Sequence, residues 1–149
     1  MRLRKKPWID KALPEVIQAG LLYREDIGQM QGHWQERFPC RELCLEIGCG
    51  KGGFITGMAA LHPEKAFIGI ETQSDIAYYP AKKAMESGLD NVVILCGDAA
   101  YMEDWFMPGE IKTLYLNFSD PWPKARQAKR RLTHRNFLGM YLKLLGPGG

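Results

Sequence analysis

Short apolar segments alternate with amphipathic segments from Leu43 onward, and this alternation constrains the fold more than any other feature of the chain. The apolar segments have the length and composition of buried strands, and they cover residues 43–47, 67–70, 92–96 and 113–117. Helical patterns lie between them at residues 54–61 and 75–87. Strands that alternate with helices pair in parallel through right-handed crossovers. The sequence therefore predicts an α/β, Rossmann-like fold with a mostly parallel sheet and helices on both faces.

The two ends of the chain are less regular than its centre. Residues 1–42 mix charged residues with prolines and show no sustained period, which predicts a basic arm and one short helix that lead into a domain over residues 43–149. Near the other end, Thr133 or Asn136 can cap a last helix, which Gly146-Pro147 ends. The apolar positions of this helix follow three-to-four spacing and are Phe137, Met140, Tyr141, Leu144 and Leu145.

Pro80 conflicts with the second helical pattern, because an interior proline costs a helix about 3 kcal/mol. Two arrangements are compatible with the sequence. Pro80 lies inside a helix over residues 75–87, or it begins a shorter helix and leaves Tyr78 and Tyr79 in a loop.

The composition is that of a soluble globular domain. The chain has 149 residues, of which 46% are hydrophobic and 25% are charged. No run of about 18 apolar residues occurs, and no apolar segment follows the basic start, so we expect no membrane span, no secretory signal and a cytoplasmic location. The four cysteines form no CxxC pair, which predicts free thiols and no bound metal. The sequence is compatible with a monomer and with a homodimer.

A glycine-rich segment follows the first predicted strand. Gly48, Gly50 and Gly53 have GxGxxG spacing, at a strand-to-helix turn where glycines let the backbone come close to a ligand. This spacing alone is compatible with a dinucleotide and with S-adenosylmethionine.

Three acidic residues at predicted strand ends favour S-adenosylmethionine. Glu71 ends the second strand about 20 residues after the glycines, where its carboxylate can accept both ribose hydroxyls of either cofactor. Glu46 precedes the first glycine and suits the cationic amino acid end of a ligand, and Asp98, after the third strand, can reach an adenine amino group. Three carboxylates would repel a pyrophosphate but attract a sulfonium and an ammonium. Asp98 is also compatible with a helix N-cap.

A stiff loop follows the fourth predicted strand, at residues 117–124. Two prolines restrict its backbone and hold an acid, an aromatic ring and a lysine, which are Asp120, Trp122 and Lys124. Because ligands bind at the carboxyl ends of strands in open α/β sheets, this composition suits a flat ligand such as a nucleobase. A structural turn with a packed tryptophan is the alternative.

Basic residues cluster in and directly after this loop, and no acidic residue follows Asp120. Six of them fall within twelve positions and are Lys124, Arg126, Lys129, Arg130, Arg131 and Arg135. Such a run can be a solvated face. Its position beside the loop favours nucleic acid, whose phosphates the run would hold while a base reaches the loop.

Four motifs together resemble those of the bacterial tRNA (guanine-N7)-methyltransferases, which are class I S-adenosylmethionine-dependent enzymes. The motifs are residues 45–52 (LEIGCGKG), residues 69–71 (GIE), residues 117–124 (NFSDPWPK) and residues 129–132 (KRRL). The glycine motif is generic to methyltransferases, whereas the SDPWPK loop followed by KRRL is specific. The basic start up to Trp8 and the segment Gly32-His33-Trp34 are similar to the family too.

The resemblance implies a function and a set of site residues. The function is transfer of a methyl group from S-adenosylmethionine to nitrogen 7 of a guanosine in the variable loop of tRNA. Asp120 would be the catalytic residue, Lys124 a substrate contact, and residues 126–131 an RNA-binding segment. The implied cofactor site combines the glycines Gly48 and Gly50 with four acidic residues, Glu46, Glu71, Asp98 and Asp120.

The family continues beyond a Gly-Gly such as Gly148-Gly149 into further strands, so we expect the C-terminal strands to be missing from this chain. Two alternatives remain. The chain is an RNA-binding or inactive truncated fragment of such an enzyme, or it methylates an exocyclic amine of a nucleobase, because residues 120–122 also resemble the loop of enzymes with that chemistry. Trp122, which stands where a second proline is usual, argues against the exocyclic amine.

Nitrogen 7 of guanine carries a lone pair and no proton, so its attack on a methyl group needs no general base. We therefore expect Asp120 to orient the reactants and to stabilise positive charge that develops on the ring. Trp122 would stack on the base, and Lys124 would hold a phosphate or a ribose.

Overall fold

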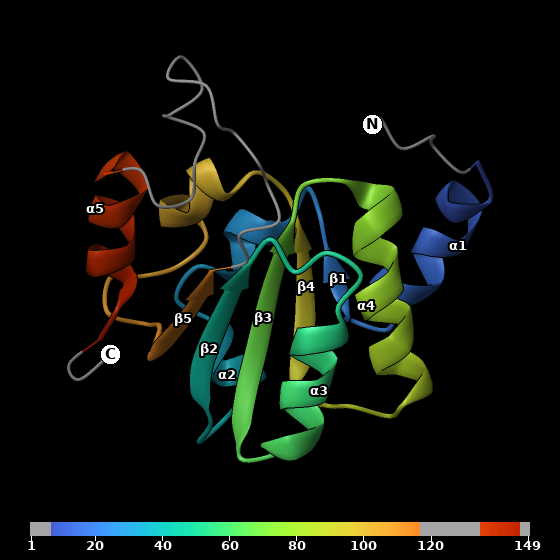
Figure 1. Cartoon of the computed structure of the whole chain (residues 1–149), viewed down its shortest axis with the longest axis horizontal. Coiled ribbons are helices and arrows are strands. Elements are labelled where there is room, and N and C mark those ends of the chain that lie inside the picture. Colours follow the sequence, from blue (N-terminus) through green and yellow to red (C-terminus); the bar gives the residue numbers. More distant parts are fainter. Residues whose placement is uncertain (1–6, 117–134, 147–149) are drawn as a thin grey trace.

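The computed structural model describes residues 7–116 and 135–146, and a sheet of five strands forms its centre (Figure 1). Every strand pair is parallel, in the order β1-β4-β3-β2-β5. The predicted parallel α/β fold is confirmed. The strands are β1 Leu22–Tyr23, β2 Glu42–Ile47, β3 Lys65–Glu71, β4 Val92–Cys96 and β5 Thr113–Leu116.

The carboxyl ends of the central strands meet at one edge of the sheet. Ile47 of β2 pairs with Ile70 of β3 on one side and with Leu116 of β5 on the other, and Ile70 pairs with Leu95 of β4. The strand order reverses at β2, because the chain first builds β3 and β4 on one side and then returns to place β5 on the other. Open α/β sheets bind their ligands at the carboxyl ends beside such a reversal.

Helices cover both faces of the sheet (Figure 1). One face is covered by α1 Pro7–Gln18, α3 Gly53–Leu61 and α4 Ser74–Glu86. The other face is covered by α2 Trp34–Arg37, α5 Arg135–Leu144 and two 3-10 helices, η1 Ile27–Met30 and η2 Ala99–Asp104. None of the helices in residues 7–116 and 135–146 is both long enough and apolar enough to cross a membrane.

Side chains along β2 alternate between the two faces of the sheet. Leu43, Leu45 and Ile47 lie in the core on the side of α2 and α5. Cys44 lies in the core on the side of α1, α3 and α4, and Glu46 has the same orientation because it follows two residues later. Strand β2 therefore carries a carboxyl group on the α3 face, one residue before its carboxyl end.

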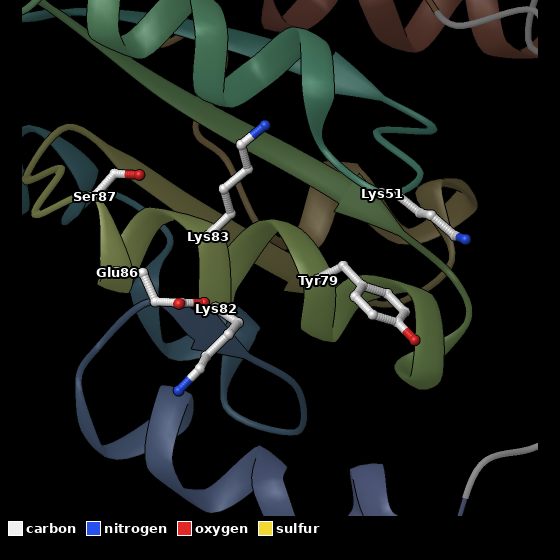
Figure 2. A pocket seen from close by; sticks show the side chains of 6 residues that line it. All are labelled: Lys51, Tyr79, Lys82, Lys83, Glu86 and Ser87. Atoms are coloured by element: carbon white, nitrogen blue, oxygen red, sulfur yellow. The ribbon is translucent and has the colours of Figure 1, made fainter.

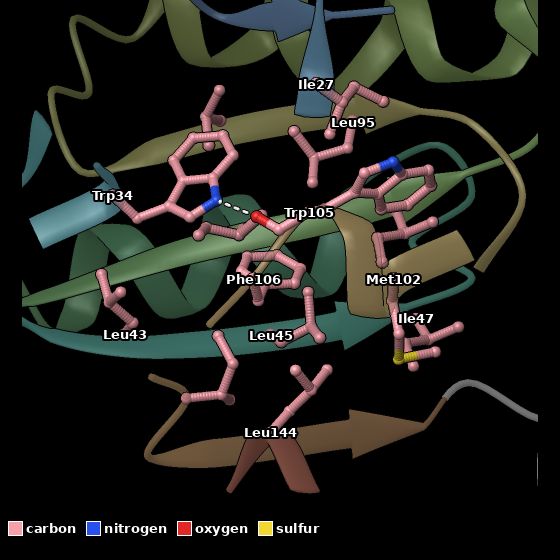
Figure 3. Packing of buried hydrophobic residues seen from close by; sticks show 14 of the residues in the cluster. Ile27, Trp34, Leu43, Leu45, Ile47, Leu95, Met102, Trp105, Phe106 and Leu144 are labelled. Atoms are coloured by element: carbon pink, nitrogen blue, oxygen red, sulfur yellow. Dashed lines mark hydrogen bonds between the residues drawn. The ribbon is translucent and has the colours of Figure 1, made fainter. Parts of the chain in front are cut away.

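The segment before β2 contributes more to the core than the expected arm with one short helix. It supplies a fifth strand, β1, which pairs with β4, whereas the sequence predicted four strands. Trp34 and Phe38 are fully buried, and the Nε1 atom of Trp34 donates a hydrogen bond to the carbonyl oxygen of Trp105 at 2.8 Å (Figure 3). Strand β1 has two residues and α2 has four, which is too short for either to produce a recognisable period in the sequence.

Helix α4 begins at Ser74 and continues through Pro80 to Glu86. The arrangement in which Pro80 begins the helix is therefore wrong, and Tyr78 and Tyr79 are helical. Pro80 is buried, and its ring lies against Gly52 of the glycine-rich segment. Burial of the ring offsets part of the cost of the backbone hydrogen bond that a proline cannot donate.

Helix α5 packs on the sheet as the spacing of its apolar residues predicts. Tyr141 and Leu144 are buried in the core, and the partly buried residues packed against it include Phe137, Met140 and Leu145. Asn136 lies inside the helix, so it is not the residue that caps it. Thr133, the other predicted cap, lies outside the described residues.

Candidate cofactor-binding site

Three glycines in the left-handed region shape the turn between β2 and α3. Gly48, Gly50 and Gly52 have φ values of 77°, 55° and 84°, which residues with a Cβ rarely adopt. The backbone N–H groups of Gly48 and Cys49 donate to the carbonyl oxygen of Ile70 at 2.8 and 3.0 Å, so the turn lies over the end of β3. Among the described residues, no heavy atom lies within 4 Å of a Cβ built on Gly50. A ligand can therefore approach the backbone closely at this glycine.

Glu71 is the last residue of β3, and two backbone groups hold its carboxylate. Oε1 accepts a hydrogen bond from the N–H group of Gly50 at 3.1 Å, and Oε2 accepts one from the N–H group of Gln73 at 3.2 Å. These bonds orient the carboxylate beside the glycine turn. Each oxygen has a second lone pair, so the side chain can also accept from two adjacent hydroxyl groups of a ligand.

Glu46 is the most unusual polar residue of this edge. Its side chain is 5% exposed, and its Oε1 atom has no hydrogen-bond partner among the described residues. Burial raises the pKa of this carboxyl group to about 7. In the sheet register it stands between Gly69 of β3 and Tyr115 of β5. A buried oxygen without a donor is costly, so this position fits a ligand that brings a donor or a positive charge.

The thiol of Cys49 is close enough to both glutamates for their charges to change its pKa. Burial raises the pKa of its thiol, and the carboxylates of Glu71 and Glu46 raise the pKa further. The side chain has room because the opposing residue is Gly69, where a Cβ would lie 3.0 Å from the Cys49 sulfur. Glu46, Glu71 and Cys49 therefore lie close together beside the glycine turn, and the thiol stays neutral.

Asp98 follows β4 at the same edge of the sheet. The N–H group of the preceding residue, Gly97, donates to the carbonyl oxygen of Glu71 at 3.1 Å, which ties this segment to the end of β3. Oδ1 of Asp98 accepts a hydrogen bond from the N–H group of Ala100 at 2.9 Å and caps η2. The N-cap alternative is thus confirmed, and contact between Asp98 and a cofactor stays a prediction.

The structure brings together four of the predicted cofactor residues, which are Glu46, Gly48, Gly50 and Glu71. Gly53, the third glycine of the GxGxxG spacing, is the first residue of α3, and the third left-handed glycine is Gly52 instead. Leu116, the last residue of β5, pairs with Ile47 at this same edge. The predicted residues Asp120, Trp122, Lys124, Arg126, Lys129, Arg130 and Arg131 lie outside the described residues.

Two features near this edge were not predicted from the sequence. Phe54 and Tyr115 form an edge-to-face pair at 5.2 Å, and Tyr115 stands opposite Glu46 in the sheet. Alternation along β5 could have placed Tyr115 on that face. The second feature is a hollow beside the glycine turn (Figure 2). Its lining is Lys51, Tyr79, Lys82, Lys83, Glu86 and Ser87, and the three-to-four spacing of the α4 residues is the signal that could have indicated it.

Comparison with known proteins agrees with a methyl-transfer function. A family model described as a putative methyltransferase matches residues 40–149. The tRNA (guanine-N(7)-)-methyltransferase of Limosilactobacillus reuteri (strain DSM 20016) is 46% identical over 150 residues, which cover 100% of this chain and 69% of that protein. The protein of the same name from Lactococcus lactis subsp. cremoris (strain MG1363) is 45% identical, with 100% of this chain and 68% of that protein covered.

Solved structures share the fold at lower identity. The antibiotic-resistance methyltransferase Kmr superposes with a TM-score of 0.63 at 22% identity, over 79% of this chain and 61% of that chain. Phosphoethanolamine N-methyltransferase 2 of Haemonchus contortus, in complex with S-adenosyl-L-methionine, superposes with a TM-score of 0.56 at 17% identity, over 80% of this chain and 27% of that chain. These structures support the Rossmann-like architecture.

Proposed function

The chain belongs to the family of tRNA (guanine-N(7)-)-methyltransferases, and on this premise we propose that it transfers a methyl group from S-adenosylmethionine to nitrogen 7 of a guanosine in tRNA. The guanosine is in the variable loop of the tRNA. The observation that carries the proposal is the unpartnered Oε1 atom of buried Glu46 beside the left-handed glycine turn. This pairing of a buried acid with an open backbone suits a cationic ligand and disfavours a pyrophosphate.

The residues at the carboxyl edge fit S-adenosylmethionine, which supplies an electrophilic methyl group on a sulfonium. Glu46 would accept from its ammonium group, which satisfies the buried oxygen. Glu71, oriented by the Gly50 N–H group, would accept the ribose hydroxyls. Asp98 would accept from the adenine amino group with Oδ2, while Oδ1 caps η2.

The loop after β5 would bind the guanine. Asp120 would orient the base and stabilise the positive charge that develops on the ring, Trp122 would stack on the base, and Lys124 would hold a phosphate or ribose. The basic residues Arg126, Lys129, Arg130 and Arg131 would bind the RNA backbone.

The direct test is to identify the methylated nucleoside. Purified chain is incubated with an unmodified tRNA transcript and methyl-labelled S-adenosylmethionine, and the RNA is then digested to nucleosides. We expect 7-methylguanosine as the labelled product. Label on an exocyclic amine of adenosine or cytidine would instead support the alternative chemistry, and tRNA binding without label would support a binding function alone.

The assignment of Glu71 has its own test, the variant Glu71→Gln. The amide keeps an oxygen that accepts from Gly50, but it loses the charge that strengthens hydrogen bonds to a ligand. We expect the affinity for S-adenosylmethionine, measured by calorimetry, to fall about tenfold. Glu42→Gln, at the opposite end of β2 and exposed, is the matched control and should bind like the unmodified chain. Equal affinities for the two variants would contradict the assignment.

A further inference from the structure

The hollow beside the glycine turn is lined by two separate elements and is rich in lysine. Lys51 comes from the turn, and Tyr79, Lys82, Lys83 and Glu86 come from one face of α4 (Figure 2). These four α4 residues follow the three-to-four spacing that places side chains on the same side of a helix. The opposite side of α4, with Ala77, Pro80, Ala81 and Ala84, is buried. The lysines are therefore an outward surface of the α3 and α4 layer, with a cavity of about 460 Å³ between them.

Two of the three lysines have no acidic partner in the described part of the chain. Lys82 lies 3.5 Å from the Glu15 carboxylate of α1, and this is an exposed ion pair of small stability. Lys83 extends away from α1 (Figure 2), and the described residues place no carboxylate within salt-bridge distance of it or of Lys51. Lys51 lies over the ring of Tyr79, with its Nζ atom 5.5 Å from the ring centre. The Tyr79 ring thus positions the ammonium group of Lys51, whose charge can bind an anion.

The hollow adjoins the glycine turn of the candidate cofactor site through Lys51. Lys51 stands between Gly50, whose N–H group binds Glu71, and Gly52, which packs on Pro80 of α4. Its lining runs from Lys51 and Tyr79 to Ser87, and eight residues of helix extend about 12 Å. Three lysines and one acidic residue, Glu86, line the hollow, so its net charge is positive. A positive surface that spans several residues suits phosphates of one backbone better than a single phosphate ion.

We propose that the hollow lined by Lys51, Lys82 and Lys83 binds phosphates of the tRNA backbone while the guanosine occupies the carboxyl edge. The inference rests on the proposed function, which supplies the polyanion. The hollow, on the α3 and α4 layer, is then a second RNA-binding surface in addition to the basic residues that follow β5 in the sequence. Lysine contacts of this kind add affinity without sequence preference and make binding depend on salt.

The test compares the salt dependence of tRNA binding in the full chain and its variants. In the double variant Lys82→Gln, Lys83→Gln, we expect the slope of log affinity against log salt to become less negative by about 1 to 2. The affinity should fall about fivefold for each lost phosphate contact near 0.15 M salt. S-adenosylmethionine affinity should be unchanged. Lys65→Gln, at the amino end of β3 on the far edge of the sheet, is the control and should behave like the unmodified chain.

A second variant separates phosphate binding from support of the fold. Lys83→Glu leaves the Lys82 and Glu15 pair intact and reverses one charge, so it should weaken tRNA binding more than Lys83→Gln at a temperature where both variants are fully folded. Its melting temperature should fall slightly, because position 83 is in the last turn of α4 and three residues before Glu86. If the slope and the affinity are unchanged in the double variant and in Lys83→Glu while the unmodified chain binds tRNA, the hollow is not an RNA site. The proposed function would still stand. Weakening that appears only at temperatures where the variants are partly unfolded would overturn the hollow as an RNA site as well. Failure of the unmodified chain to bind tRNA would instead refute the proposed function and this inference together.

Discussion

Gly52 and Pro80 lie so close that a Cβ atom on Gly52 would be 2.2 Å from the Cβ atom of Pro80 and 2.8 Å from its Cα atom. Gly52 precedes α3 in the left-handed conformation, and Pro80 is inside α4. The contact joins the glycine turn to the helix that follows β3. The position of the turn, and with it the approach to Gly50, therefore depends on a close contact between two backbones.

We expect Gly52→Ala to destabilise the chain by about 2 kcal/mol or more, because alanine must adopt a positive φ and displace the backbone of Pro80. Chemical denaturation measures this change. Gly57→Ala is the matched control, since Gly57 lies inside α3, is exposed and has open space around a built Cβ. That variant should stabilise the chain by up to about 1 kcal/mol. Similar effects of the two substitutions would show that the Gly52 contact is unimportant.

The sequence predicted the four long strands to within two residues, because each is an apolar run bounded by turn residues. It did not predict β1 or α2, whose two and four residues are placed by tertiary contacts. The sequence left the start of α4 open, because a proline can lie inside a helix or begin one. The packing of the Pro80 ring on Gly52 accompanies the arrangement in which the helix passes through Pro80. Local pattern thus determined the sheet, and packing determined the lead-in segment.

Trp34 tests how far this lead-in segment stabilises the domain. We expect Trp34→Phe to cost about 2 to 4 kcal/mol, because it leaves the buried carbonyl of Trp105 without its donor and opens a small cavity. The free energy of unfolding in urea is the measurement. Trp8→Phe is the control, since Trp8 is 51% exposed and packs on the edge of Tyr78. If both variants lose less than about 1 kcal/mol, residues 7–41 do not belong to the cooperative core.

The candidate site was partly predictable for a physical reason. Glu46, Gly48, Gly50 and Glu71 adjoin strand ends, and parallel pairing brings strand ends together. The adjacent glycines Gly52 and Gly53 cannot be distinguished by spacing, since the left-handed residue is set by contact with α4. The sequence also could not show that Glu46 is buried with an unpartnered oxygen, because this depends on α3 covering that face.

The raised pKa of Glu46 predicts a dependence of stability on pH. The unfolded chain releases this proton near the ordinary glutamate pKa of about 4.3, whereas the folded chain keeps it until about pH 7. Between these values the folded state binds more protons, so the free energy of unfolding should fall as the pH rises and then level off above pH 7. The expected loss from this residue is about 3 to 4 kcal/mol.

Glu46→Gln isolates this contribution, because the amide is neutral at every pH. We measure the free energy of unfolding in urea for the variant and for the unmodified chain. Between pH 5 and pH 8 the unmodified chain should lose stability relative to the variant. A constant difference would show that Glu46 is ionised throughout. The same variant should lose affinity for S-adenosylmethionine at pH 8, since it cannot offer a negative charge to the ammonium group.

Asp120→Asn tests whether the acid acts by charge or as a base. Asparagine keeps the size of the side chain and one oxygen acceptor, but it cannot stabilise positive charge on the guanine ring. We expect kcat with saturating tRNA and cofactor to fall about 100- to 1,000-fold. Because nitrogen 7 has no proton to lose, no proton is transferred in the methyl-transfer step, and kcat of the unmodified chain should be nearly equal in H2O and D2O. Asp90→Asn is the control, since Asp90 is exposed and pairs with Arg41 at the amino edge of the sheet. An unchanged rate in Asp120→Asn would remove the electrostatic role, and a marked solvent isotope effect on kcat would restore the general base.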